Sequence, residues 1–315
     1  MTGSYAGGPV LAEVVRSGFV ESVHRGSVVV LDAAGAVVDA AGDVTSQIFP
    51  RSSNKPLQAT GMLRAGLRLA DPAHLALVCA SHSGEPEHIA GVRAMLRAGG
   101  LTEGDLGCPA DLPIGEEARK DWLHAGRGAE RVAMNCSGKH AGMLLTCIAA
   151  GWPTEDYRSP DHPLQKQLRT VVEELAGQPA AAVGVDGCGA PVFAMSLRAL
   201  AEAFLRVAET EVADAMRAFP VLVGGAGPER EDTRLMRGVP GLVAKGGAEG
   251  VLAIAVPEVG AVALKIDDGA KRPIGPVAVV ALRRLGVDAP VLAELEEHDV
   301  LGGGQPVGVT RSVWG

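Results

Sequence analysis

The stretch "IFPRSSNKPLQATGMLRAG", residues 48–66, places two serines and a lysine where a strand-like segment gives way to a helical one. Ser52 and Lys55 are three residues apart, so both side chains lie on one face of a helix that starts near Ser52. A serine hydroxyl is a poor nucleophile at neutral pH, and a deprotonated lysine nearby can act as its base. The free N–H groups and positive dipole end of a helix N-terminus favour neutral lysine and stabilise an oxyanion. The spacing therefore suits acyl transfer.

The same residues also fit a structural role. Ser52 or Ser53 would then cap the helix above Pro56, and Lys55 would be solvated. For an isolated S-x-x-K pattern this structural role is the default interpretation, so the choice between the two roles depends on the rest of the chain.

The segments on either side of this stretch predict an α+β fold. Residues 13–22 and 27–43 have the pattern of strands, with a hairpin turn at 33–35, and residues 249–269 predict a second hairpin turning at 257–260. Helical periodicity dominates from about 55 to 220, and one more helix is predicted over 275–286. We expect one domain over residues 1–315. Its antiparallel sheet would be built from about 10–50 and 250–268, flanked by helices, as in the serine β-lactamase and penicillin-binding fold.

Composition and charge favour a small-molecule partner. The 315 residues are 47% hydrophobic and carry a net charge of −8 without a basic stripe, which argues against nucleic acid and acidic membrane surfaces as partners. The longest apolar runs are interrupted before they could span a bilayer, and the N-terminus lacks the pattern of a secretion signal. These features predict a cytoplasmic protein.

Lysine is rare in this chain. Only seven of the 29 basic residues are lysine, so arginine meets most surface needs. Lysine can lose its proton when it is desolvated, whereas arginine effectively cannot. A lysine in a Gly- or Ser-rich motif therefore suggests a chemical role, and four lysines lie in such motifs: Lys55, Lys139, Lys245 and Lys265.

Eight segments, in order from about Glu13 to Arg272, together resemble the rhizobial-type L-asparaginase family, also called asparaginase II. They are "EVVRSGFVESVHRG", "FPRSSNKPLQ", "CASHSGEPEH", "NCSGKHAGMLL", "HPLQ", "VDGCGAPVFAMSL", "AKGGAEGV" and "ALKIDDGAKR". The family is similar in fold to serine β-lactamases and glutaminases, and its members hydrolyse L-asparagine to aspartate and ammonia. The resemblance also implies a homodimer.

The resemblance assigns roles to the serines and lysines. It implies that Ser52 is the nucleophile, that Lys55 is its base and that Arg51 borders the pocket. Ser83 and Lys265 resemble a second serine-lysine pair that passes protons and holds the charged end of the substrate, with Lys265 on a strand beside the serine helix.

The second serine is ambiguous. Ser81 lies close enough in "SHSGE" to be the one meant, and for Ser83 alone a turn-capping role before Gly84 is the ordinary interpretation.

The "NCSGKH" motif is a candidate for metal binding. It is not a P-loop, because Ala133 stands where the required glycine would be. Two distant cysteines, Cys136 and Cys188, are by themselves more often small buried apolar residues. The resemblance implies instead that they hold zinc together with Lys139, and that these three residues contribute to substrate binding.

Other polar residues near these motifs have more than one interpretation. Asp186 would bind the substrate ammonium, orient a catalytic group, or cap the helix that starts near Ser196. The histidines show no metal-ligand spacing, so each is expected to be a hydrogen-bonded structural residue. The glycine-rich segments lack the strand-to-helix context of a dinucleotide fingerprint, so no organic cofactor is expected.

Three functional classes follow from the sequence. The first is an amidohydrolase acting on asparagine, the second a related serine hydrolase acting on glutamine, a β-aspartyl peptide or another amide, and the third a non-enzymatic zinc-binding protein. One methylene in a pocket changes binding by only about 1–3 kcal/mol, so the motifs do not separate asparagine from glutamine.

Overall fold

The computed structural model describes residues 5–315 and builds their main sheet from both ends of the chain. In this part of the chain the sheet contains eight strands, namely β1 (Val10–Arg16), β2 (Phe19–Asp32), β3 (Val37–Ala41), β8 (Val243–Gly247), β9 (Val251–Val256), β10 (Gly260–Ile266), β11 (Glu297–Gly302) and β12 (Gln305–Ser312). The order is β11-β12-β1-β2-β10-β9-β8, with β3 paired to β2, and all pairs are antiparallel. Two short pairs lie apart from it: β4 (Gln47–Ile48) with β7 (Met195–Ser196), and β5 (Val183–Val185) with β6 (Pro191–Phe193).

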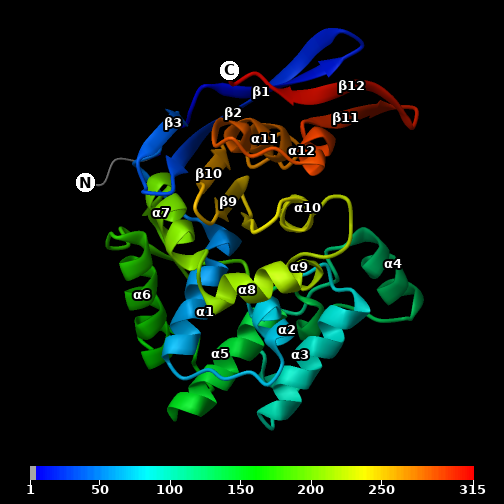
Figure 1. Ribbon diagram of the computed structural model, residues 1–315. Helices are drawn as coiled ribbons and strands as arrows, with labels where there is room; N and C mark the ends of the chain where they lie inside the picture. Colours follow the sequence, from blue (N-terminus) through cyan, green and yellow to red (C-terminus); the bar gives the residue numbers. More distant parts are fainter. Residues whose placement is uncertain (1–4) are drawn as a thin grey trace.

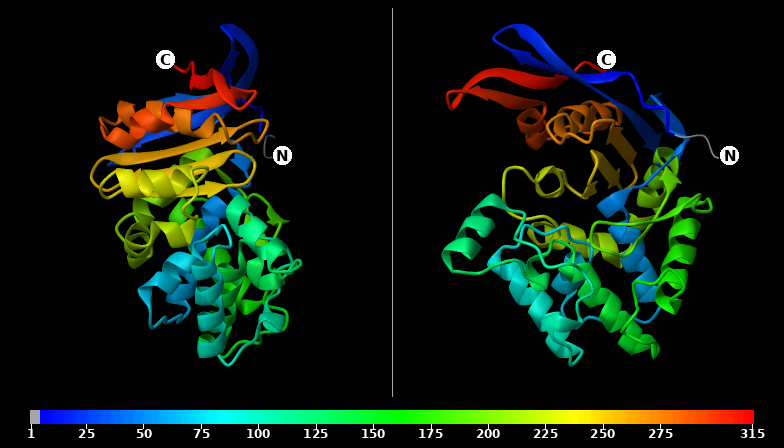
Figure 2. Two further views of the ribbon diagram at one scale, coloured as in Figure 1. Left: turned by 90° about the vertical axis from the view of Figure 1, so that its right-hand side faces the viewer. Right: turned by 180° about the vertical axis from the view of Figure 1, so that it is seen from behind.

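Helices from the middle of the chain form a second part of the molecule, beside the sheet (Figure 1, Figure 2). They are α1 (Lys55–Arg64), α2 (Pro72–Val78), α3 (Pro86–Ala98), α4 (Glu116–His124), α5 (Ser137–Ala150), α6 (Pro163–Ala176), α7 (Leu197–Val207), α8 (Glu211–Ala218) and α9 (Pro220–Val223). Three further helices follow: α10 (Glu231–Gly238), α11 (Ile274–Arg284) and α12 (Pro290–Leu295). Short 3-10 helices are η1 (Arg51–Asn54), η2 (Glu103–Asp105) and η3 (Arg131–Ala133).

The central strands are buried on both faces. Every residue of β9 is buried, and so is every residue of β10 except Lys265. Helix α7 packs against β2, β9 and β10, and α11 packs against β10, β2 and β12. Strands covered on both faces show continuous apolar runs rather than alternation, which explains the "VLAIAV" and "GAVAL" sequences.

Helix α1 lies at the centre of the helical part. It packs against α5, α6 and α7, and its residues from Lys55 to Met62 are all buried. A helix buried all round needs no polar face, so Lys55 lies inside the protein and not in solvent. This position contradicts the solvated Lys55 of the structural interpretation.

The predicted α+β class with an antiparallel sheet is confirmed, and so are the two hairpin turns and the late helix. Two details of the prediction are wrong. Residues 13–22 are not one strand but a hairpin, which turns at Ser17 and Gly18 with φ values of 48° and 82°. The sheet also extends beyond the expected ranges, to β8 and to the β11–β12 hairpin. The β11–β12 sequence is largely exposed and carries little alternation, so it gave no strand signal.

Within residues 5–315, no helix is long and apolar enough to cross a membrane.

We expect Leu57→Ala, in the core of α1, to lower the free energy of unfolding by about 2–5 kcal/mol, because Leu57 is fully buried and a cavity would remain. Urea unfolding followed by circular dichroism measures this. Leu301→Ala is the matched control, since Leu301 is 57% exposed and its loss should cost less than about 0.5 kcal/mol. Equal losses in both variants would contradict the central placement of α1.

Candidate active site

Ser52 lies in η1, between the end of β4 and the start of α1. The preceding residue, Arg51, has a φ of +53°, a left-handed conformation that is uncommon for a residue with a side chain. Its guanidinium Nε donates a hydrogen bond to Asp186 Oδ1 at 2.8 Å. Backbone strain of this kind persists only where surrounding contacts impose it, and it concentrates at functional sites.

Strand β8 approaches η1 closely because it ends in glycine. A Cβ at Gly247 would lie 2.5 Å from the carbonyl oxygen of Pro50 and 3.0 Å from Ser53 Oγ. Ser53 Oγ donates to the carbonyl oxygen of Lys245 at 2.8 Å, which ties the serine turn to the strand. No side chain caps η1 or α1, so the prediction that Ser52 or Ser53 caps the helix is wrong.

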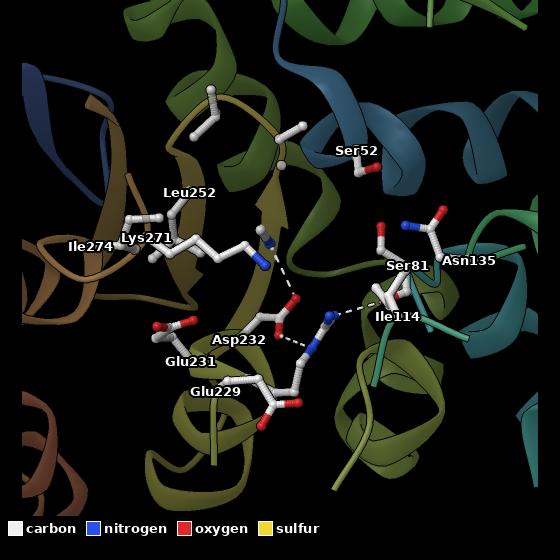
Figure 3. A pocket seen from close by; sticks show the side chains of 15 residues that line it. Ser52, Ser81, Ile114, Asn135, Glu229, Glu231, Asp232, Leu252, Lys271 and Ile274 are labelled. Carbon is white, nitrogen blue, oxygen red and sulfur yellow. Dashed lines mark hydrogen bonds and ion pairs between the residues drawn. The ribbon is translucent and has the colours of Figure 1, made fainter. Parts of the chain in front are cut away.

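A cavity of about 170 Å³ opens beside Ser52 (Figure 3). Ser52, Ser81 and Asn135 lie on one side of it, and Asp232, Glu231 and Lys271 project from the opposite side. Ser52 is half-buried, so its hydroxyl is accessible from the cavity. The size of the cavity suits a small metabolite rather than a polymer.

Lys55 is connected to Ser81. It is 1% exposed, and its ammonium donates to Ser81 Oγ at 3.0 Å, to Cys136 Sγ at 3.1 Å and to the carbonyl oxygen of Ala80. These three acceptors account for all three of its N–H groups. Among the described residues Ser52 Oγ has no hydrogen-bond partner, so no bond joins it to Lys55.

Lys245 is a second buried lysine near this serine-lysine helix. It is fully buried on β8, with its ammonium 3.5 Å from Asp232 Oδ2 and donating to the carbonyl oxygen of Gly246 at 2.7 Å. Burial lowers the pKa of Lys245 to about 7, and the positive charges of Lys55 and Arg230 add to this against the opposing effect of Asp232. Lys245 therefore changes its charge near neutral pH.

Asp232 is held in its charged form. Burial raises the pKa of its carboxyl, but Arg230 and Lys245 outweigh burial and bring the pKa to about 2. Arg230 in turn donates to the carbonyl oxygen of Ser81 at 2.8 Å. Strand β8, the start of α10 and the Ser81 loop are therefore joined through one charged network.

The structure does not bring Ser83 and Lys265 together. Ser83 Oγ donates to the carbonyl oxygen of Gly224 at 2.9 Å and does not line the cavity. Lys265 lies on β10, where its ammonium donates to the carbonyl oxygen of Glu249 at 2.9 Å. It lines a separate cavity of about 430 Å³, which Arg51 also borders.

The predicted placement of Lys265 beside the serine helix is wrong, because β8 and not β10 packs against η1. Ser81 and Lys245 lie at the positions that were predicted for Ser83 and Lys265. Lys245 is one of the four lysines for which the lysine-poor composition suggests a chemical role, but the family resemblance assigns it none.

Cys136, Cys188 and Lys139 converge beside Lys55. Lys139, 1% exposed, donates to Cys188 Sγ at 3.1 Å. The interaction with Cys136 and the charge of Lys139 lower the pKa of Cys188, although burial opposes this. The same interaction and burial raise the pKa of Cys136. Cys188 is therefore a thiolate and Cys136 a thiol.

Asp186, His82 and His140 each form a side-chain hydrogen bond. Asp186 accepts from Arg51, whereas Ser196 itself caps α7 by accepting from Ala199 N, so the prediction that Asp186 caps this helix is wrong. His82 Nε2 bonds with Ser137 Oγ at 2.8 Å, and His140 Nδ1 bonds with the Tyr157 hydroxyl at 2.6 Å.

The family model described as L-asparaginase II matches residues 12–312 of this chain. The chain belongs to the L-asparaginase II family. The match covers nearly the whole chain and supports an asparaginase-type amidohydrolase that acts on a small molecule.

Among solved structures, the chain is similar to a β-lactamase from Mycobacterium bovis at 14% identity and a TM-score of 0.38, covering 83% of this chain and 95% of the other. A search of curated proteins finds no significant match.

Within this asparaginase II chain, the cysteine cluster offers donors of the kind that zinc accepts. Two sulfur atoms and one amine nitrogen converge, and zinc binds thiolates and nitrogen ligands. Between residues 5 and 315 no three His, Cys, Asp or Glu side chains form a metal-binding group, so Lys139 would have to be the third ligand. Although burial opposes it, the negative charge of Cys188 raises the pKa of Lys139, so a metal would have to displace its proton.

We expect the stability of Lys245→Met, relative to the wild type, to be most favourable near pH 6. The pKa of Lys245 is about 7 in the folded state and 10.5 in the unfolded state. Such a lysine lowers the free energy of unfolding by its full amount below pH 7, and this loss disappears as the pH rises through 10.5. The advantage of the methionine variant should therefore shrink between pH 7 and 10, by at most about 1.4 kcal/mol per pH unit. Urea unfolding of both proteins across this range measures it. A stability difference that does not change with pH would show that Lys245 stays charged in the folded protein.

Proposed function

We propose that this protein hydrolyses L-asparagine to L-aspartate and ammonia through an acyl-enzyme on Ser52. The observation that carries the proposal is the position of Ser52, half-buried and open to a small cavity whose polar wall includes Ser81. The small volume of the cavity favours a free amino acid amide over a peptide.

In the proposed reaction, Lys55 acts as the deprotonated amine, with one of its three donor contacts given up. Ser52 Oγ bonds to the side-chain amide carbon of asparagine, and its proton passes to the Lys55 amine. Lys55 already holds Ser81 Oγ at 3.0 Å, so it can return this proton through Ser81 to the amide nitrogen. The C–N bond then breaks and ammonia leaves. Water cleaves the resulting ester, which yields aspartate and restores Ser52.

Lys245 supports this reaction in two ways. Its carbonyl oxygen holds Ser53, so it fixes the serine turn against β8. Its ammonium lies 3.5 Å from Asp232, so it also joins β8 to the charged network beside the cavity.

We also propose that Cys136, Cys188 and Lys139 hold zinc. A zinc ion there would act as a Lewis acid toward a substrate oxygen. Cys136 contacts Lys55 at 3.1 Å, so the cysteine cluster lies directly behind the serine-lysine helix. Homodimer formation stays a prediction.

We expect purified protein to release ammonia from L-asparagine much faster than from L-glutamine, and Ser52→Ala to lower kcat by at least about 10³-fold while asparagine still binds. Lys55→Arg should be nearly as damaging, since arginine keeps the charge but cannot accept a proton. An enzyme-coupled ammonia assay and calorimetric binding measure these effects.

Ser83→Ala is the control for this experiment, because Ser83 lies outside the cavity. If Ser83→Ala were more damaging than Ser52→Ala, the nucleophile would lie in "SHSGE". Equal rates on asparagine and glutamine would assign the protein to a broader class of amidase.

For the zinc proposal, we expect Cys136→Ala and Cys188→Ala each to remove bound zinc and to raise KM for asparagine more than they lower kcat. Elemental analysis by mass spectrometry and steady-state kinetics measure both. Cys147→Ala, a buried free cysteine elsewhere on α5, should retain the metal. Metal-free wild-type protein with full activity would refute the zinc proposal.

A further inference from the structure

The side of the cavity opposite Ser52 carries two charges of opposite sign that are not paired. Lys271 and Glu231 both line this side, and Figure 3 shows the Lys271 side chain extended into the cavity toward the serine wall. Within residues 5–315, neither the ammonium of Lys271 nor the carboxylate of Glu231 forms an ion pair or a side-chain hydrogen bond, either with each other or with a third residue.

Most of the other charged groups around the cavity are already engaged. Arg230 pairs with Asp232 at 3.6 Å, and Asp232 also lies 3.5 Å from Lys245 and accepts from the Gly246 amide. Lys55 has all three of its N–H groups satisfied. Among the described residues that line the cavity, the charges without an ion pair are therefore Lys271, Glu231 and the exposed Glu229.

Glu231 is also poorly solvated. Burial raises the pKa of its carboxyl, and Lys271 lies near enough for its charge to oppose this effect. A carboxylate that has lost water without gaining a partner is favoured by an incoming cation. Glu229, by comparison, is exposed at the rim and keeps its hydration.

Asparagine presents matching charges at its other end. When its side-chain amide lies at Ser52, its α-ammonium and α-carboxylate point away from the serine, and the apolar wall made by Leu252 and Ile274 cannot solvate them. The groups predicted earlier to hold this charged end are occupied elsewhere, since Lys265 lines another cavity and Asp186 is bonded to Arg51.

We propose that Lys271 binds the α-carboxylate of the substrate and Glu231 its α-ammonium, so that this pair selects zwitterionic α-amino acids. The inference rests on the proposed function for its substrate, and it adds two specificity-determining residues to that function. A salt bridge to each end of the zwitterion would also set the distance from the charged end to Ser52, which bears on the choice between asparagine and glutamine.

The test compares L-asparagine with two truncated amides. β-Alaninamide lacks the α-carboxylate and succinamate lacks the α-amino group. Lys271→Met should lower the ratio of kcat/KM for asparagine to that for β-alaninamide by roughly 10- to 100-fold, mainly through KM. Glu231→Gln should lower the corresponding ratio of asparagine to succinamate to a similar extent. Lys271→Arg should recover most of the loss, because arginine also binds carboxylates.

Lys166→Met, an exposed lysine on α6, is the matched control and should leave both ratios unchanged. If Lys271→Met affected asparagine and β-alaninamide equally, Lys271 would not contact the carboxylate, and the inference would be wrong.

Calorimetric titration of L-aspartate into Ser52→Ala protein separates this inference from the proposed function. Absence of ammonia release from asparagine by the wild type would refute the proposed function alone. The inference still requires that L-aspartate binds and that adding Lys271→Met weakens this binding by roughly 10-fold or more. Unchanged binding, or no binding of L-aspartate at all, would overturn it.

Discussion

The close packing of β8 against η1 is the contact on which the rest of the site depends. The strand lies so close to Pro50 that a side chain at position 247 would not fit, which is why Gly247 stands there. The hydrogen bond from Ser53 to the Lys245 carbonyl fixes the register of the two segments. These segments are almost two hundred residues apart in sequence. Their contact places Ser52 of the helical part opposite the residues of β8 and α10, and so it creates the cavity.

Three lysines are buried behind this contact, and each is stabilised by a different means. Lys55 gives its three N–H groups to neutral acceptors, Lys139 forms an ion pair with the Cys188 thiolate, and Lys245 has a pKa of about 7. An isolated buried ammonium would be costly, so each arrangement compensates for lost hydration. The compensation also orders the site, because each lysine joins segments that are distant in the chain.

The sequence predicts those parts of the structure that depend on local pattern or on matched motifs. The hairpins at 33–36 and 257–259, the helix after Pro273 and the serine-lysine spacing at Ser52 all follow from neighbouring residues. Strand β8 could not be predicted in this way, because its glycines weaken the strand pattern and its conformation is imposed by β9 and η1. The role of Lys265 follows instead from the family resemblance, which assigns no role to Lys245.

The arrangement of the site explains where this chain uses its few lysines. Arginine keeps its charge at any depth, so it serves well where the charge is permanent, as in the pairs of Arg51 with Asp186 and Arg230 with Asp232. Lysine is used in the interior where a proton must be lost or shared. Lys271 is different, since it is exposed and forms no ion pair or side-chain hydrogen bond within residues 5–315. A long, flexible cation without a partner gains nothing for folding, and its position facing the serine wall is accounted for by a ligand that brings the opposite charge.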